Sequence, residues 1–134
     1  MRYVLGVVLA TMAIFSAQSI FACSCAPPPP PKEALDKAAA VFMGKVKSIE
    51  GGGFAVKVTF DVDTSFKGVK KKEVVVQTAS NGAMCGYGFT KGEVYVVYCY
   101  GKKDALRTGL CTRTRPASRA KGDLDALGEG TPIE

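Results

Sequence analysis

The 134-residue chain contains no histidine and no tryptophan. The absence of histidine excludes Ser-His-Asp and Cys-His nucleophilic systems, histidine-containing zinc sites and the commonest general base near neutral pH. A redox C-x-x-C motif is also absent, and the single C-x-C pair has no second cysteine pair to complete a four-cysteine zinc site. We therefore expect a protein that is not an enzyme, needs no cofactor and holds no metal ion of its own.

Charge is scarce at the N-terminus, where Arg2 is the only charged residue within 1–22. An apolar run follows Arg2, and the stretch ends with the small residue Ala22. This order is typical of a secretory signal peptide, and the apolar run is too short to span a bilayer comfortably. The sequence therefore predicts a signal peptide over 1–22, cleavage before Cys23, and a secreted, extracellular or periplasmic product with no later transmembrane segment.

The residues around the predicted cleavage point leave a second interpretation open. Ile20-Phe21-Ala22-Cys23 is similar to a bacterial lipobox, a motif in which the cysteine is acylated after cleavage. On that interpretation the product is a membrane-tethered lipoprotein, with a lipid anchor on Cys23.

The predicted mature chain, residues 23–134, is modestly basic. Without Arg2 it carries 17 basic and 12 acidic side chains, a net charge of +5. This balance suits loose attraction to anionic surfaces, but it is not a nucleic-acid signature by itself, and export argues against a nucleic-acid partner. Lysines 70–72 indicate a solvated loop tip, and Asp61 and Asp63 indicate a solvated strand face more than a catalytic acid pair.

Five cysteines remain after the predicted cleavage: Cys23, Cys25, Cys85, Cys99 and Cys111. In an oxidising compartment such cysteines normally form disulfides, and their odd number leaves at least one free, intermolecular or modified. Four cysteines in two pairs allow three connectivities, and spacing cannot choose among them.

The pattern of apolar residues predicts a small β-rich domain. Residues 54–66 alternate apolar and polar side chains over thirteen positions, which indicates a long, half-buried antiparallel strand with Phe54 on its inner face. Prolines 27–31 predict an extended segment, Gly44 an interruption of its strand, and residues 51–53 a hairpin connection. The remaining strands are expected at 41–49, 74–78, 94–100 and 106–111, with helices at 33–40 and between 116 and 128. Short turns and the lack of a βαβ rhythm favour an antiparallel barrel or sandwich, followed by a frayed tail at 129–134.

Several short motifs occur in a fixed order along this chain. They are C-x-C at 23–25, V-F-x-G-K-V at 41–46, F-K-G at 66–68, C-G-Y-x-F at 85–89, K-G-E-x-Y at 91–95 and L-C-T-R-T at 110–114. Together they cover nearly all of the mature chain, which resembles the netrin-like module, and within it the N-terminal domain of the tissue inhibitors of metalloproteinases. The leader and the proline-rich start are more similar to a bacterial member. The resemblance implies a mainly β domain over 23–128, an OB-fold-like five-stranded Greek-key barrel with short flanking helices, stapled by disulfides.

The resemblance also implies a disulfide pairing and a function. By position, Cys23 would pair with Cys85 and Cys25 with Cys111, which leaves Cys99 as a buried free thiol. In the inhibitors, the free α-amino group and the carbonyl of the first cysteine chelate the catalytic zinc of a metalloprotease. Carried over, that cysteine is Cys23. The ridge that contacts the protease would consist of Ser24, Cys25, Ala26, Pro27, Ala83 and Met84, with Ser24 directed into the primary specificity pocket.

An alternative function remains open. Netrin-like modules also occur in complement proteins and netrins, where they do not inhibit proteases, and a fold alone does not determine a function. The alternative is a non-inhibitory, secreted or lipid-anchored protein-binding module with another extracellular protein as its partner.

Overall fold

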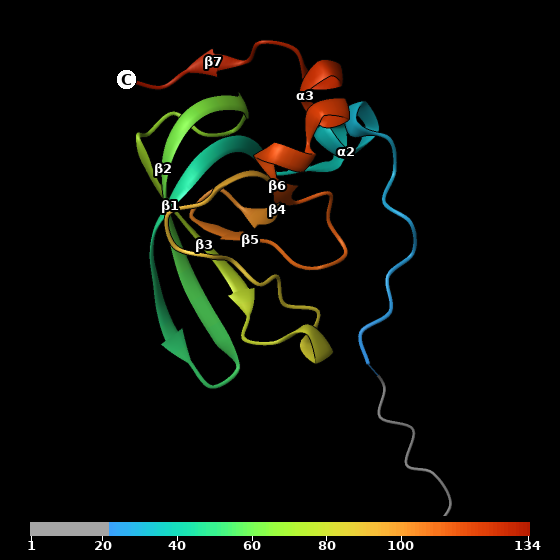
Figure 1. Cartoon of the computed structure of the whole chain (residues 1–134), viewed down its shortest axis with the longest axis vertical. Coiled ribbons are helices and arrows are strands. Elements are labelled where there is room, and N and C mark those ends of the chain that lie inside the picture. Colours follow the sequence, from blue (N-terminus) through green and yellow to red (C-terminus); the bar gives the residue numbers. More distant parts are fainter. Residues whose placement is uncertain (1–21) are drawn as a thin grey trace, which may run out of the picture.

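Five strands close into a barrel (Figure 1). The structure, a computed structural model, describes residues 22–134, so the predicted signal peptide, except Ala22, lies outside the described residues. The barrel order is β1-β2-β3-β5-β4, and β4 pairs back onto β1. All of these pairs are antiparallel except β3–β5, which is a parallel bridge between Gln77 and Arg107. The expected OB-fold-like five-stranded barrel is confirmed. Its strands are β1 (Ala40–Gly52), β2 (Ala55–Lys67), β3 (Glu73–Ala79), β4 (Val94–Lys102) and β5 (Ala105–Arg107).

Strands β1 and β2 form the longest hairpin, and its register is irregular at Gly44. The pairing shifts between Met43 and Gly44, where a Cβ atom on residue 44 would lie 2.7 Å from the backbone oxygen of Asp61. The predicted interruption is therefore a bulge, and β1 continues beyond it to Gly52. The prediction that Phe54 lies on the inner face of the strand is wrong. Phe54 is 81% exposed, because it belongs to the hairpin turn and not to strand β2.

The barrel interior is filled by apolar and aromatic side chains. Phe42 and Phe60 meet edge to face with ring centroids 5.3 Å apart, and Phe60 and Phe89 do so at 5.2 Å. A second apolar cluster lies outside the barrel wall, where Val41 and Val96 are fully buried beneath the helices. Strands β1 and β4 therefore bury side chains on both faces, which explains their continuous apolar runs.

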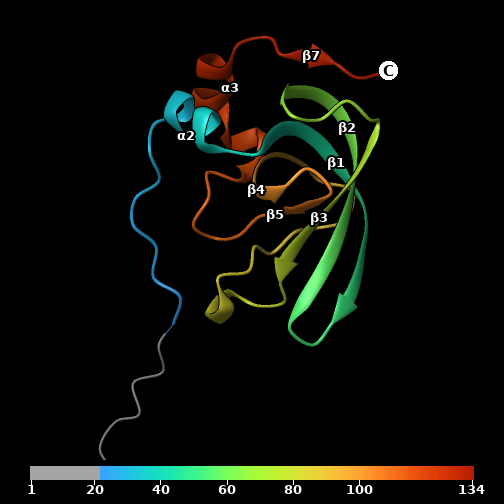
Figure 2. The same cartoon turned by 180° about the vertical axis from the view of Figure 1, so that it is seen from behind.

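The helices gather at one side of the barrel, away from the tip of the β1–β2 hairpin (Figure 2). They are α2 (Pro31–Lys37), which precedes β1, and two elements that follow the short strand β6 (Arg115–Pro116): the 3-10 turn η3 (Ala117–Arg119) and α3 (Lys121–Leu127). The helix predicted at 33–40 is shifted, because Pro31 starts α2 and proline suits the first turn of a helix. Across residues 22–134 no helix has the length and apolar character needed to cross a membrane.

Two predictions about the second half of the chain are wrong. The strand predicted at 106–111 ends at Arg107, because residues 109–111 turn toward Cys85, whose carbonyl accepts the Leu110 amide at 2.8 Å. The tail at 129–134 is not frayed. Its strand β7 (Thr131–Pro132) pairs with β2, the Ile133 amide donates to the Asp63 carbonyl at 3.0 Å, and the Ile133 side chain packs against the barrel core.

Candidate functional site

The candidate site is the N-terminal segment that leads into α2. Residues 22–30 have no helix or strand, and the segment runs along one side of the molecule (Figure 1). Pro30 keeps the predicted extended conformation, whereas Pro31 already belongs to α2. The side chains of Ser24, Ala26 and Pro27 are exposed.

Two disulfides fasten this segment to the barrel. Cys23 is bonded to Cys85 and Cys25 to Cys111, and the Cα atoms are 5.1 Å apart in each pair. These are the pairs that the resemblance implies. Cys99 is free and buried in β4, and burial raises the pKa of its thiol to about 12. The segment is therefore held at two points, on the loops that carry Cys85 and Cys111.

The loop before Cys85 forms the neighbouring edge. It contains the 3-10 turn η2 (Gly82–Met84), whose start is capped by Asn81 through a 3.1 Å hydrogen bond from the Met84 amide to Asn81 Oδ1. Cys85 then takes a left-handed conformation with φ of 62°. Ala83 and Met84 are exposed, and the disulfide to Cys85 brings Cys23 beside this turn. The structure thus brings together the two parts of the predicted ridge.

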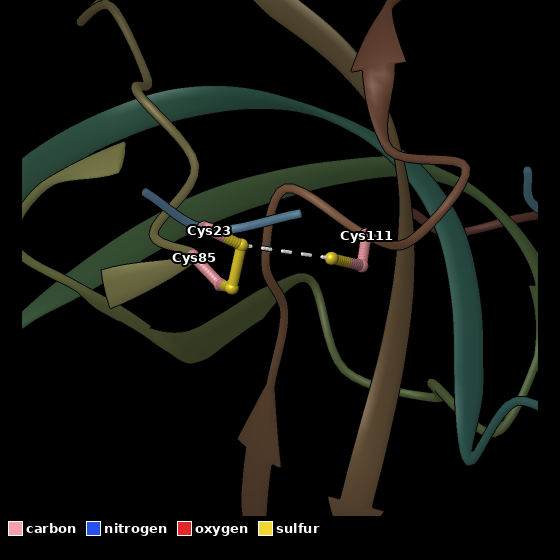
Figure 3. Close-up of side chains that lie close together, drawn as sticks. All are labelled: Cys23, Cys85 and Cys111. Atoms are coloured by element: carbon pink, nitrogen blue, oxygen red, sulfur yellow. Dashed lines mark hydrogen bonds between the residues drawn. A yellow bond between two sulfur atoms is a disulfide. The ribbon is translucent and has the colours of Figure 1, made fainter. Parts of the chain in front are cut away.

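The Cys23–Cys85 disulfide lies close to the side chain of Cys111, which belongs to the second disulfide (Figure 3). Cys23 Sγ is 3.8 Å from Cys111 Sγ, and the sulfur atoms of Cys23, Cys85 and Cys111 all lie within 4.8 Å of one another. Sequence reasoning missed this convergence, because linear spacing does not show how close two loops come in space. The signal that could have found it is the C-x-C motif at 23–25, which places the first cysteines of the two disulfides two residues apart.

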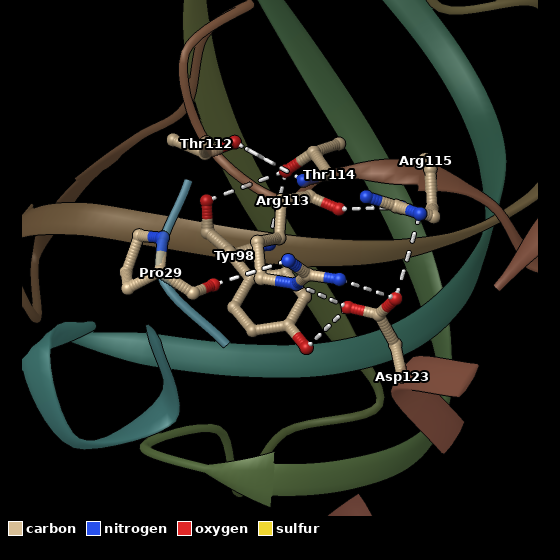
Figure 4. Close-up of polar contacts among 7 residues, drawn as sticks. All are labelled: Pro29, Tyr98, Thr112, Arg113, Thr114, Arg115 and Asp123. Carbon is tan, nitrogen blue, oxygen red and sulfur yellow. Dashed lines mark hydrogen bonds and ion pairs between the residues drawn. The ribbon is translucent and has the colours of Figure 1, made fainter. Parts of the chain in front are cut away.

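A buried polar network anchors the other end of the segment (Figure 4). Arg113 donates from Nη1 to the Pro29 carbonyl at 3.0 Å. It also donates to both carboxylate oxygens of Asp123, from Nε at 2.7 Å and from Nη2 at 3.0 Å. The Tyr98 hydroxyl donates to the same carboxylate at 2.9 Å. This network, which the sequence did not predict, ties the proline segment to α3 and β4.

The charges in this network have opposing effects on Asp123. Burial alone would raise the pKa of its carboxyl, but hydrogen bonds from Arg113 and Tyr98, together with the charges of Arg113 and Arg115, lower that pKa below its ordinary value. Burial, followed by the contact with Asp123, raises the pKa of Tyr98. At neutral pH the network is therefore an Arg113–Asp123 ion pair whose carboxylate also accepts a hydrogen bond from the neutral phenol of Tyr98.

The surface of the molecule has two depressions that bear on the candidate site and on the predicted lysine tip. One, of about 200 Å³, lies beside the proline segment and is lined by Pro28, Pro29, Ala34, Tyr98 and Arg113 among others. The other, of about 420 Å³, carries Lys70, Lys71 and Lys103 together with the carboxylates Glu73 and Asp104. The loop of lysines 70–72 is exposed, as predicted, and it borders this depression. Asp63 is also exposed, on the outer face of β2.

No protein-family model matches the chain, and no curated protein matches it in sequence. What the segment does must therefore be argued from its own geometry and chemistry.

Proposed function

We propose that the protein is a secreted inhibitor of zinc metalloproteases that acts through the N-terminus created by cleavage before Cys23. The observation that carries this proposal is the double attachment of the segment. Disulfides hold Cys23 and Cys25, while Ser24, between them, stays exposed. A chain end that is fixed in place yet accessible is suited to enter an active-site cleft.

The chemistry of a free terminus at Cys23 fits this role. A catalytic zinc keeps one coordination position open for a nitrogen or oxygen donor. An α-amino group has an ordinary pKa of roughly 7.7–8.0, so its neutral, metal-binding form is accessible near neutral pH. The amine and the carbonyl oxygen of Cys23 together would chelate the ion. Because the disulfides already order the terminus, binding costs less conformational entropy.

The exposed neighbours of Cys23 would form the rest of the contact. Ser24 would enter the primary specificity pocket of the protease, and Ala26 and Pro27 would continue along the cleft. Ala83 and Met84 of η2 would add a second edge, held beside Cys23 by the Cys23–Cys85 bond. This contact surface is the one that the motif resemblance to the netrin-like inhibitors implies.

The test begins with the mature N-terminus, determined by mass spectrometry. The purified protein is then titrated against a panel of zinc metalloproteases, with a matched variant that carries one extra alanine before Cys23. We expect inhibition by the protein with a free Cys23 amine, weaker inhibition as the pH falls below the pKa of that amine, and none by the extended variant. Inhibition that survives the extension would refute the amine as the zinc ligand.

A second candidate is a non-inhibitory binding module, favoured by the lysine-rimmed depression at Lys70, Lys71 and Lys103. Its lining also contains Glu73 and Asp104, so three lysines against two carboxylates leave a small net positive charge, which suits an acidic region of another extracellular protein. An acylated Cys23, or a free one that inhibits none of the proteases, would favour this candidate.

A further inference from the structure

A single bridge joins β3 to β5, and the barrel wall opens beside it. We propose that an extended acidic segment of another extracellular protein binds in this opening as an added strand on the edge of β3. The proposal rests on the second candidate function, the basic depression at Lys70, Lys71 and Lys103, and gives it a binding mode. It uses no residue of the N-terminal segment, so it does not depend on the proposed inhibition.

The edge of β3 is open along the first part of the strand. Among the described residues, β3 pairs with β5 only at the Gln77–Arg107 bridge, beside which the Thr108 amide donates to the Gln77 carbonyl at 2.9 Å. On its other side, β3 pairs with β2 over its whole length. Residues 73–76 therefore have a neighbouring strand on the side of β2 but none on the side of β5.

The ladder with β2 shows which backbone groups face the opening. In an antiparallel pair, residues that bond to the partner strand alternate with residues whose N–H and C=O groups point away from it. The Val62 amide donates to the Lys72 carbonyl at 2.7 Å, so the even-numbered residues of β3 are the ones that bond to β2. The N–H and C=O groups of Glu73 and Val75 therefore point toward the opening, where an added strand can bond to them.

The depression of about 420 Å³ lies in this opening. Its lining includes Glu73, Val74 and Val75 on the side of β3, and Leu106 on the side of β5. Val69, which also lines it, and Leu106 are buried, whereas Val75 is 47% exposed. An added strand would therefore meet an apolar surface as well as free backbone groups, and covering Val75 would favour its binding.

The charged side chains of the depression favour an acidic ligand. Glu73 already pairs with Lys47 at 2.6 Å, whereas the three lining lysines form no ion pair within residues 22–134. Counted without the Lys47–Glu73 pair, three ammonium groups face one carboxylate, that of Asp104, which leaves a net charge of +2. Carboxylates on the partner would compensate this charge.

These features together favour an extended peptide over other anionic ligands. Side chains of a strand alternate between two faces, so a peptide of alternating apolar and acidic residues could direct one set toward Val69 and Leu106 and the other toward the exposed lysines. An anionic polysaccharide carries the charge but has no peptide backbone to pair with the edge of β3. The partner that fits is therefore an acidic segment able to form a β-strand.

The test uses blocked synthetic peptides and the disulfide form of the chain from residue 23. One peptide alternates glutamate and valine. A second has the same sequence with its backbone nitrogens methylated, which keeps the charge but removes the backbone donors, and a third alternates lysine and valine. By calorimetry at low salt we expect binding of the first peptide alone. In that complex, hydrogen exchange at the amides of Glu73 and Val75 should slow.

Variants of the charged side chains test the proposed charge contacts. The triple substitution Lys70→Gln, Lys71→Gln and Lys103→Gln should weaken binding of the glutamate–valine peptide by about 10-fold, since three exposed ion pairs are lost. The matched control makes the same change in net charge at exposed lysines outside the depression, with Lys45→Gln, Lys57→Gln and Lys91→Gln. It should leave the affinity within about twofold, because salt screens distant charges.

Val75→Pro tests the backbone edge directly. Because the Val75 amide points away from β2, proline there removes no hydrogen bond of the β2–β3 ladder, and proline is tolerated at such an edge. We expect loss of peptide binding with an unchanged circular dichroism spectrum. If this variant does not fold, the methylated peptide supplies the same test from the side of the ligand.

The proposal would be overturned by no binding of the glutamate–valine peptide, by equal binding of its methylated form, or by equal losses from the two triple substitutions. Equal binding of a sulfated polysaccharide, without slower exchange at Glu73 and Val75, would indicate a site for any polyanion and would overturn it too. The alanine extension before Cys23 separates this proposal from the inhibition. It should abolish inhibition but leave peptide binding unchanged, so either proposal can fail without the other.

Discussion

Replacing Asp123 with asparagine tests whether the buried network holds the helices on the barrel. The substitution keeps the size of the side chain and one oxygen acceptor but removes the charge. Asp123 is 2% exposed and receives two hydrogen bonds from Arg113 and one from Tyr98. In the variant, the guanidinium of Arg113 loses the negative charge that compensates its burial.

The expected loss follows from that uncompensated charge. Removing one partner of a buried ion pair typically costs about 3–5 kcal/mol. The Arg113 side chain is 15% exposed, so water partly replaces the carboxylate, and the asparagine oxygen still accepts one bond. We therefore expect a loss near the lower limit, about 3 kcal/mol. For a domain of this size that corresponds to a fall in melting temperature of roughly 10 °C or more.

The assay is urea unfolding of the disulfide form at pH 7, followed by circular dichroism. Asp125→Asn is the matched control. Asp125 lies on the same helix and pairs with Lys121 at 2.7 Å, but both side chains are exposed, so its loss should cost under about 0.5 kcal/mol. Equal losses from the two substitutions would refute the role given to Asp123.

The pH dependence supplies a second check. Because the folded-state pKa of Asp123 is lowered, its contribution is fully present above the unfolded-state pKa of about 3.9. It is lost as the pH falls through the lower, folded-state value. The stability gap between the unmodified protein and Asp123→Asn should thus stay constant between about pH 7 and 5 and shrink below about pH 4.

Three further predictions concern other parts of the fold. Cys99 is buried and the pKa of its thiol is raised to about 12, so it should resist alkylation in the native protein and become alkylated when the protein is unfolded. Alkylation of the native protein would contradict its burial. Gly68→Ala should cost about 2 kcal/mol or more in urea unfolding, because φ is +75° and the new Cβ would lie 2.5 Å from the Ala39 carbonyl oxygen. Gly53→Ala, at φ of +68° in open space, should cost only about 1 kcal/mol, and equal costs would refute the clash. Deleting residues 131–134 should destabilise the protein by about 1–2 kcal/mol, because Ile133 leaves the core, whereas an unchanged urea midpoint would show that β7 contributes nothing.

The strands were predictable where one face of the chain is buried. The alternation at 54–66 arises because side chains on a strand point to opposite faces, and Val58, Phe60 and Val62 are indeed fully buried. The same rule failed at Phe54, because periodicity does not show where a hairpin turn begins. Local pattern also could not show that β4 returns to β1 or that β3 meets β5, since those pairs join residues far apart in the chain.

The anchors of the candidate site were the least predictable features. Asp123 lies on the buried side of α3 near Ala120 and Leu124, yet an aspartate in a helix ordinarily indicates a solvated face. Its partner Arg113 is ten residues away, and no spacing rule joins them. Strand β7 has only two residues, too few for any periodicity to reveal it.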